Sequence, residues 1–276
     1  MKTLFFLLAL FCCFACAPKK PTDGPITLTR EDVTITVDPQ LGGRITSLTL
    51  HGREILKTSR DSLNLQWGST VWTSPQSTWK WPPPATFDAE PFTWELLRDS
   101  VILLESARDP DSQLRMRKRI SLGPDADVGL TYWLINEGVS TVRVAAWENT
   151  RLPYAGYLEF AADSIRFRQD STPVVTRDST HYIYLDDRHR GPEKVFADLA
   201  ADSVTFYRDG LFLRKFAGIT HLFHTAPEQA PLEIYFNPEA GFMEFELQGE
   251  YKLLEPGEHV SLRTRWKVGD YSSSRR

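Results

Sequence analysis

The chain has 276 residues, of which 41% are hydrophobic and 25% charged. This is the composition of a globular protein, and it excludes a disordered or fibrous chain. The 16 glycines and 18 prolines leave little room for long helices. A formal net charge of −4 predicts no broad basic surface, so nucleic acid is not expected as a partner.

The N-terminus has the features of an export signal. Lys2 precedes an apolar run over residues 4–15, which is shorter than the roughly 20 residues that a membrane-spanning helix needs. We therefore expect residues 1–15 to be a signal peptide. All three cysteines lie in or directly after this segment, so no disulfide is expected in the mature domain.

The segment Cys13-Phe14-Ala15-Cys16 resembles a relaxed bacterial lipobox. By this resemblance, Cys16 becomes the lipidated first residue of the mature protein, which is then anchored to a membrane of the bacterial cell envelope by its acyl chains. The residues after Cys16 are not acidic, which favours the periplasmic side over the cell surface. Secretion after cleavage nearby is the alternative. The expected order is then a lipidated Cys and tether (16–25), a single domain (26–270) and a C-terminal tail (271–276).

The remaining sequence is a succession of strand-length segments bounded by Asp, Gly or Pro. They cover residues 33–37, 44–50, 101–106, 115–122, 129–135, 142–147, 203–207, 211–216, 231–236 and 242–248. Many short strands with few helices predict an all-β fold, a large antiparallel β-sandwich.

Some of these segments support more specific predictions. Residues 129–135 would be apolar on both faces of a strand, which is typical of a central strand covered on both sides. The turn at 136–138 predicts a hairpin with residues 142–147, and a second hairpin is predicted for residues 231–248. Only residues 193–201 have helical spacing of apolar side chains.

The common catalytic motifs are absent. The chain has no phosphate-binding loop, no dinucleotide fingerprint, no G-x-S-x-G and no H-E-x-x-H. His221 and His224 are three residues apart, so on a strand they would face opposite sides and would not bind one metal ion together. We therefore expect neither a metal nor a cofactor.

The second predicted hairpin has one apolar and one polar face. Glu244, Glu246 and Gln248 alternate with Met243, Phe245 and Leu247, and the partner strand places Glu233, Tyr235 and Asn237 on its polar side. Carboxylates that share a face raise one another's pKa, which suits a general base. The other interpretation is a solvated sheet face with its carboxylates in water.

Five of the eight tryptophans lie between residues 67 and 94. Trp79 and Trp81 are two residues apart, so on an extended chain they point to the same side. Indole rings offer rigid apolar area for the C–H faces of sugars, and Gln76 could bond to sugar hydroxyls. We expect Trp72, Trp79 or Trp81 to contact a ligand, whereas Trp67 and Trp94 are the better candidates for core packing.

Residues 41–56, 68–84 and 244–268 resemble the galactose mutarotase-like (aldose 1-epimerase-like) sandwiches, and are closest to a bacterial branch described only as a domain of unknown function. The aromatic and proline-rich stretch 68–84 is the most specific of the three. The resemblance implies the supersandwich fold of that superfamily and a carbohydrate ligand.

In that superfamily, a base takes the proton of the anomeric hydroxyl while an acid protonates the ring oxygen. The resemblance implies that Glu246, in the segment FELQ, is the base. The Asn-His pair of the family is missing, because the comparable stretch carries Glu148, Asn149 and Arg151, so His221 or His224 is the candidate acid. The residues expected to line the same cleft are Arg44, Glu148, Arg151, Glu244 and Gln248.

Three functions remain open from the sequence. The first is an epimerase that interconverts sugar anomers by acid/base catalysis without a cofactor. The second is a non-catalytic carbohydrate-binding lipoprotein that uses the aromatic segment. The third is an envelope scaffold that has lost the site. The sequence does not determine the sugar or the oligomeric state.

Overall fold

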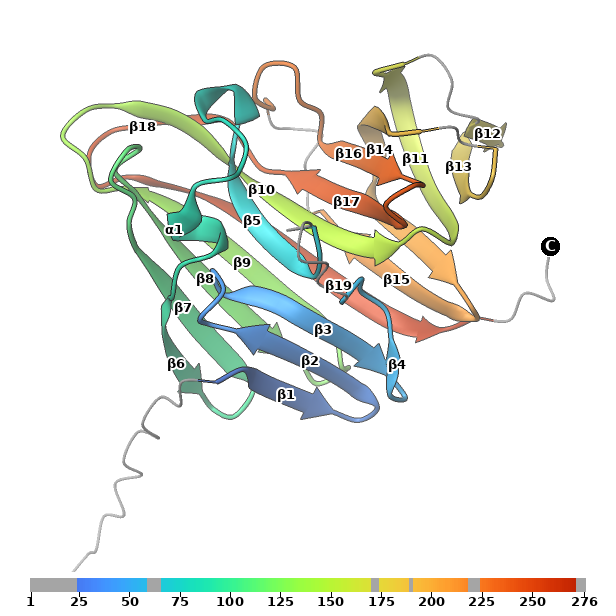
Figure 1. Ribbon diagram of the computed structural model, residues 1–276, viewed down its shortest axis with the longest axis horizontal. Coiled ribbons are helices and arrows are strands. Elements are labelled where there is room, and N and C mark those ends of the chain that lie inside the picture. The colour runs from blue at the N-terminus through green and yellow to red at the C-terminus, as the bar shows by residue number, and fades with distance from the viewer. Residues whose placement is uncertain (1–23, 59–65, 170–173, 189–190, 218–223, 272–276) are drawn as a thin grey trace, which may run out of the picture.

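A computed structural model describes residues 24–58, 66–169, 174–188, 191–217 and 224–271 (Figure 1). Antiparallel strands make up most of the regular structure of these residues, with 62% in strands and 3% in helices, so the predicted all-β sandwich is confirmed. The helices among the described residues are the single turns η1 (Gln76–Thr78) and α1 (Ala85–Asp88). Within the same residues, no helix is long and apolar enough to cross a membrane.

The first layer is a run of neighbouring antiparallel strands at the back of Figure 1. In spatial order it contains β6 (Thr93–Leu97), β7 (Val101–Arg108), β8 (Leu114–Leu122), β9 (Val128–Asn136), β19 (His259–Asp270) and β15 (Leu211–Phe216).

The second layer lies in front. Its strands, in spatial order, are β1 (Ile26–Arg30), β2 (Val33–Asp38), β3 (Arg44–Leu50), β5 (Ser69–Ser74), β10 (Val142–Pro153), β17 (Phe242–Gln248) and β16 (Leu232–Asn237). Short strands β4 (Arg53–Glu54) and β18 (Lys252–Leu254) pair with β3 and β10, respectively. At the far end, β11 (Gly156–Phe167) continues into β13 (Thr180–Leu185) and β12 (Val174–Arg177).

Strand β14 (Glu193–Arg208) joins the two layers. Its first part pairs with β16 and its last part with β15, while β11 runs along both. The expectation of a helix over residues 193–201 is therefore wrong. Val195, Ala197 and Leu199 are buried at every second position, because a strand buries one face with period two.

The first predicted hairpin is also wrong. Strand β9 pairs with β8 and β19, whereas β10 pairs with β5 and β17, because the chain crosses to the other layer after the turn at residues 136–138. β9 is central within its layer, as predicted, but it buries only one face fully. The hairpin of β16 and β17 is confirmed, with Glu233 opposite Glu246.

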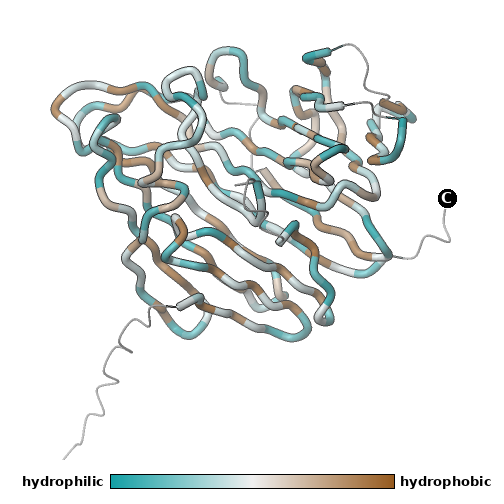
Figure 2. Tube along the Cα trace, viewed as in Figure 1, coloured by the Kyte–Doolittle hydropathy of each residue, from teal (hydrophilic) through white to brown (hydrophobic). Residues whose placement is uncertain are grey.

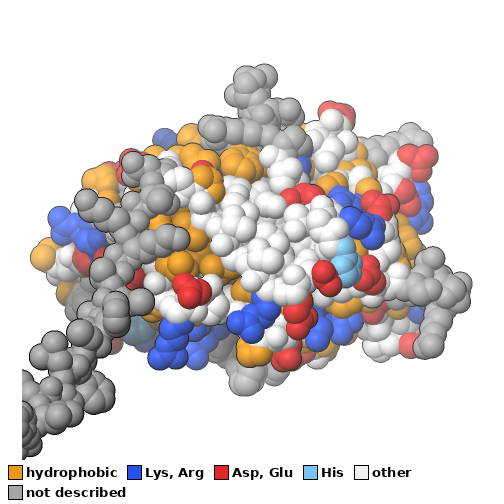
Figure 3. Space-filling model, turned by 90° about the horizontal axis from the view of Figure 1, so that it is seen from below, with side chains coloured by type: hydrophobic (Ala, Val, Ile, Leu, Met, Phe, Trp, Pro, Cys, Tyr) orange, Lys and Arg blue, Asp and Glu red, His pale blue; other side chains and the backbone are white. Residues whose placement is uncertain are grey.

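The core lies between the layers. The strands alternate between apolar and polar side chains, visible as alternating brown and teal along the tube in Figure 2. Met243, Phe245 and Leu247 of β17 and Leu232, Ile234 and Phe236 of β16 all belong to the core. Seen from below, a stretch of uncharged polar side chains and backbone lies beside hydrophobic side chains, and charged side chains of both signs line its lower and right edges, with no large patch of one sign on this face (Figure 3).

Candidate functional site

The second layer carries a row of polar side chains on its outer face, away from the core. We call this the polar face. It consists of Thr70 and Trp72 from β5, Trp147, Asn149 and Arg151 from β10, Glu244, Glu246 and Gln248 from β17, Glu233 from β16 and Lys194 from β14. The register pairs Asn149 with Glu246, and Arg151 with Glu244, so these side chains are direct cross-strand neighbours.

The polar face is buried. Glu233, Glu246, Asn149 and Arg151 are 0% exposed and Glu244 is 6% exposed. The interpretation of the hairpin as a solvated sheet face is therefore wrong. Charged groups removed from water are costly unless they are paired, so the arrangement must be held by specific partners.

Glu246 is fixed by two donors at one of its oxygens. Its Oε2 accepts a hydrogen bond from Trp147 Nε1 at 2.8 Å and an ion pair from Lys194 Nζ at 2.9 Å. Burial raises the pKa of Glu246, Lys194 lowers it, and the neighbouring carboxylate of Glu233 raises it further. The net direction is upward, which makes this carboxylate a stronger proton acceptor than an exposed one.

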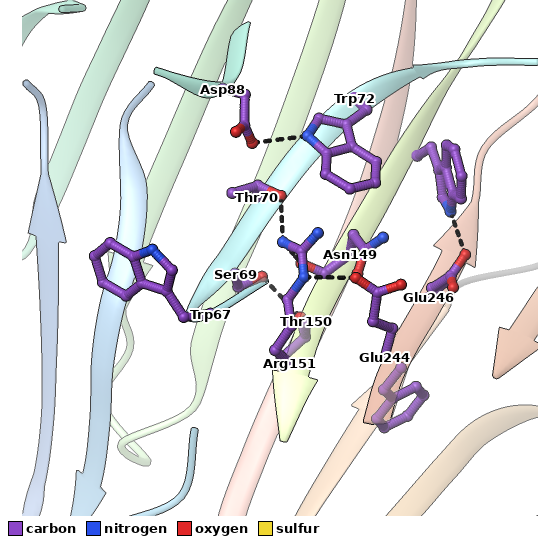
Figure 4. A network of polar contacts seen from close by, with 12 residues as sticks. Trp67, Ser69, Thr70, Trp72, Asp88, Asn149, Thr150, Arg151, Glu244 and Glu246 are labelled. Carbon is purple, nitrogen blue, oxygen red and sulfur yellow. Dashed lines mark hydrogen bonds and ion pairs between the residues drawn. The ribbon is translucent and has the colours of Figure 1, made fainter. Parts of the chain in front are cut away.

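Arg151 lies between an aromatic ring and a carboxylate, as the close-up in Figure 4 shows. Its Nε donates to Glu244 Oε1 at 2.8 Å, its Nη1 donates to Thr70 Oγ1 at 2.6 Å, and its guanidinium carbon is 4.7 Å from the centre of the Trp72 ring. Burial raises the pKa of Glu244, and the charge of Arg151 opposes this.

Five buried polar atoms of the polar face have neither a hydrogen-bond partner nor an ion-pair partner among the described residues. They are Nδ2 and Oδ1 of Asn149, Nη2 of Arg151, Oε1 of Glu246 and Oε1 of Gln248. Most buried polar groups in native proteins are paired, and an unpaired one costs about 1–3 kcal/mol. Five on two adjacent strands mark a place that a polar ligand can satisfy.

Trp72, Trp79, Trp81 and Trp147 form one aromatic cluster at this row. The Trp72 ring lies 5.4 Å from Trp147, and 5.9 Å from both Trp79 and Trp81, mostly edge to face. Trp72 Nε1 donates to Asp88 Oδ1, and Trp79 Nε1 donates to the Thr73 carbonyl. Trp81 is 52% exposed, so the cluster extends from the buried Glu246 side to the surface.

The aromatic segment 68–84 and the carboxylate of Glu246, which are far apart in the sequence, therefore lie close together in the structure. Trp147 connects them, because its ring packs on Trp72 and its Nε1 bonds to Glu246. The rings of Trp79 and Trp81 both pack against the ring of Trp72. Trp67 is buried away from the cluster beside Arg44 (Figure 4), and Trp94 packs against the core.

Other predicted site residues lie elsewhere. Arg44 is buried behind the cluster and bonds to Asp88 and to the Trp67 carbonyl. Glu148 points into the core, where it pairs with Lys215. Gln76 is half-buried in η1, beside the aromatic cluster. His224 is exposed, and His221 and Cys16 lie outside the described residues.

Four residues of the polar face were not predicted as site residues: Thr70, Trp147, Asn149 and Lys194. Trp147 and Asn149 share a strand face with Arg151, and period-two alternation from Arg151 would have found them. Lys194 was hidden by the helical interpretation of its segment. The described residues contain no group of three or more His, Cys, Asp or Glu placed to hold a metal ion.

A groove of about 740 Å³ runs beside the aromatic segment. Trp79, Lys80, Pro82 and Pro84 form one wall, and residues 109–112 and 142–144 form much of the other. Trp79 thus belongs to the aromatic cluster and also lines this groove.

No family model and no curated protein matches the chain. Solved structures do. A TPR-domain containing protein from Parabacteroides distasonis superposes with a TM-score of 0.68 at 17% identity over 90% of this chain, which spans 47% of that protein. A galactose mutarotase-like protein from Lactobacillus casei has a TM-score of 0.64 at 14% identity, with 89% of this chain and 100% of that one covered.

A putative aldose 1-epimerase from Escherichia coli K12 has a TM-score of 0.59 at 13% identity, covering 90% of this chain and 99% of that one. At these identities the likeness is one of fold. The galactose mutarotase-like fold that the sequence predicted is confirmed.

Proposed function

We propose that the protein binds a carbohydrate on the polar face and that Glu246 acts there as a general base for interconverting sugar anomers. The observation that carries this proposal is the row of five unpartnered buried polar atoms on β10 and β17, next to a tryptophan cluster. Sugars combine many hydroxyl donors and acceptors with apolar C–H faces, so they match both parts.

The geometry of Glu246 supports the catalytic part. Trp147 and Lys194 hold Oε2, so Oε1 is left as the acceptor for an anomeric hydroxyl. Burial raises the pKa of this group and brings its proton affinity closer to that of a base that works near neutral pH. Asn149 and Arg151 offer donors for other hydroxyls from the neighbouring strand.

A non-catalytic carbohydrate-binding protein is the second candidate. The missing histidine acid favours this candidate, because none of the described histidines bonds to Glu246 and His224 is exposed. Anomer interconversion needs an acid as well as a base, and losing one partner typically costs about 10²–10⁴ in rate. The groove beside Trp79 would then hold further units of an oligosaccharide.

Two measurements on one sugar panel separate these candidates. Calorimetry with monosaccharides and short oligosaccharides measures binding, and exchange NMR on pure anomers measures interconversion. We expect binding to weaken in Trp81→Ala but not in Trp94→Ala, which removes an indole from β6. We expect Glu246→Gln to slow interconversion about 10²–10⁴-fold, while the exposed Glu95→Gln leaves the rate unchanged.

Binding without any acceleration of interconversion would retain the second candidate and reject the first. No binding by any sugar of the panel would reject both.

We also propose that the protein is a lipoprotein of the bacterial cell envelope, anchored through Cys16, within the unknown-function branch of the superfamily. The lipobox-like segment 13–16 supports this. Cys16→Ser should move the protein from the membrane to the soluble fraction of cells that express the full chain. A variant that stays in the membrane fraction would contradict the anchor.

A further inference from the structure

Lys194 connects two carboxylates on neighbouring strands. Its Nζ lies 2.6 Å from Glu233 Oε2 and 2.9 Å from Glu246 Oε2. The two glutamates face each other in the register of β16 and β17, and their side chains are 0% exposed, while that of Lys194 is 9% exposed. One cation from β14 is thus shared between two buried anions.

The remaining contacts of this trio leave one oxygen open. Glu233 Oε1 accepts hydrogen bonds from the Ala230 amide at 3.1 Å and from Gln248 Nε2 at 3.2 Å. Glu246 Oε2 accepts from Trp147 as well as from Lys194. Of the four carboxylate oxygens, only Oε1 of Glu246 has neither a hydrogen bond nor an ion pair among the described residues, since Oε2 of Glu233 is ion-paired with Lys194.

We propose that Lys194 is the positioning residue of Glu246: its ammonium neutralises Glu233 and holds Oε2, so that Glu246 presents Oε1 to the ligand as a charged acceptor. This inference rests on the proposed function of the polar face. Without the ammonium, two carboxylates would be buried side by side, and one of them would take up a proton. Glu246 could then no longer accept one.

The surroundings of Lys194 assign it to positioning rather than to proton donation. Its ammonium bonds to both carboxylates and lies 4.9 Å from the Trp147 ring centre and 5.7 Å from that of Phe196. Burial lowers its pKa, but the charges of Glu246 and Glu233 outweigh this and raise it above the ordinary value. Such a group holds its proton and is a weak acid.

Other charged groups also face Glu246 and must stay constant in a test. Glu244 lies on the same strand and Arg151 neutralises it from β10. On the core side, Lys215 of β15 interacts with Glu148 and more weakly with Glu246. None of these bonds to Oε2 of Glu246.

The test is a pH titration of the full chain labelled with ¹³C at the glutamate carboxyls, in which the Glu246 signal is the one that Glu246→Gln removes. In Lys194→Met we expect the titration midpoint of Glu246 to rise by about one pH unit or more. In Lys194→Arg, which keeps the charge and can bridge both carboxylates, the midpoint should return close to that of the unmodified protein.

Two further variants extend the test, and the first of them keeps it decisive if Lys194→Met does not fold. Glu233→Gln removes the competing anion, so the midpoint of Glu246 should fall. Lys215→Met removes a matched buried lysine and should shift the midpoint less than Lys194→Met does. An unchanged midpoint in Glu233→Gln, an unchanged midpoint in a folded Lys194→Met, or equal shifts in Lys215→Met and a folded Lys194→Met, would overturn the inference.

The sugar measurements separate this inference from the proposed function. In Lys194→Met, sugar affinity or interconversion rate should fall about tenfold one pH unit below the shifted midpoint of Glu246 and recover above that midpoint, a pH dependence that mere loss of structure does not produce. Shifted midpoints together with no sugar binding by the unmodified protein would support the positioning role and reject the proposed function. Sugar binding with unshifted midpoints would do the reverse.

Discussion

The buried ion pair between Glu148 and Lys215 offers the sharpest test of the packing between the layers. Both side chains are 0% exposed, and Lys215 Nζ lies 2.7 Å from Glu148 Oε1. The ammonium also donates to Thr150 Oγ1 at 2.6 Å and to the Phe245 carbonyl at 3.2 Å. The other oxygen of Glu148 accepts from Thr264 Oγ1 at 2.6 Å. The pair thus links β10 in one layer to β15 and β19 in the other.

Lys215→Met should destabilise the protein strongly, because it leaves the Glu148 carboxylate buried without a counter-ion. Removing one partner of a buried pair typically costs about 3–5 kcal/mol. In a domain of this size, each kcal/mol lowers the melting temperature by about 2–4 °C, so the midpoint should fall by about 6–20 °C. This is a large part of a total stability of about 5–15 kcal/mol.

Urea unfolding of a double-mutant cycle measures this energy. Glu148→Gln removes the orphaned charge but keeps an acceptor for Thr264, so Lys215→Met/Glu148→Gln should recover at least about half of the loss. Arg188→Met, at a pair with Asp186 whose side chains are 46% and 39% exposed, is the control and should cost less than about 1 kcal/mol. Additive effects in the cycle, or a Lys215→Met loss no larger than that of Arg188→Met, would refute the reasoning.

Three further predictions follow from the charged and aromatic groups. Because burial raises the pKa of Glu246 in the folded state, ionising it costs stability as the pH rises through the folded pKa; Glu246→Gln should therefore be more stable than the unmodified protein in urea at pH 8, with no gain at pH 3. Burial lowers the pKa of Lys118 to about 7, so below pH 7 its ammonium costs stability, and this cost fades as the pH rises toward 10. Lys118→Met should then be more stable at pH 6, by an amount that narrows at pH 10, and a constant difference would contradict the shift. Trp147→Phe keeps an aromatic ring at this position but loses the indole N–H that bonds to Glu246, so sugar affinity measured by calorimetry should fall about tenfold.

The sequence predicted those elements whose pattern and pairing are both local. Residues 44–50 form β3 as expected, and the hairpin of β16 and β17 has the predicted faces. The helix predicted for residues 193–201 was wrong. Its Ala, Glu, Lys and Leu residues favour a helix locally, but pairing with β11 and β16 on either side makes the segment a strand. The hairpin after β9 failed because a turn does not specify which layer the next strand joins.

The candidate site was predicted in part for the same reasons. Alternation along β17 placed Glu244, Glu246 and Gln248 on one face, and the structure keeps them there. Glu148 and Arg151 were expected in one cleft although they are three residues apart, and on a strand that spacing puts them on opposite faces. Lys194 was not predicted as a site residue because its segment was interpreted as a helix, and only a paired strand brings residue 194 beside Glu246.

The packing of strand β10 explains why the unpaired polar atoms of the polar face cannot find partners within the protein. Its inner face holds the Glu148 ion pair and its outer face holds Asn149 and Arg151, so the backbone is fixed from both sides. The unpartnered amide of Asn149 and the open oxygen of Glu246 cannot rotate into the core, which the opposite side chains of β10 and β17 fill. Unpaired polar groups held on rigid strands lower the stability of the folded protein, but they also form a preformed arrangement for a ligand. Glu246→Gln is therefore expected to be more stable and less active than the unmodified protein, and measuring both effects tests this relation between stability and function.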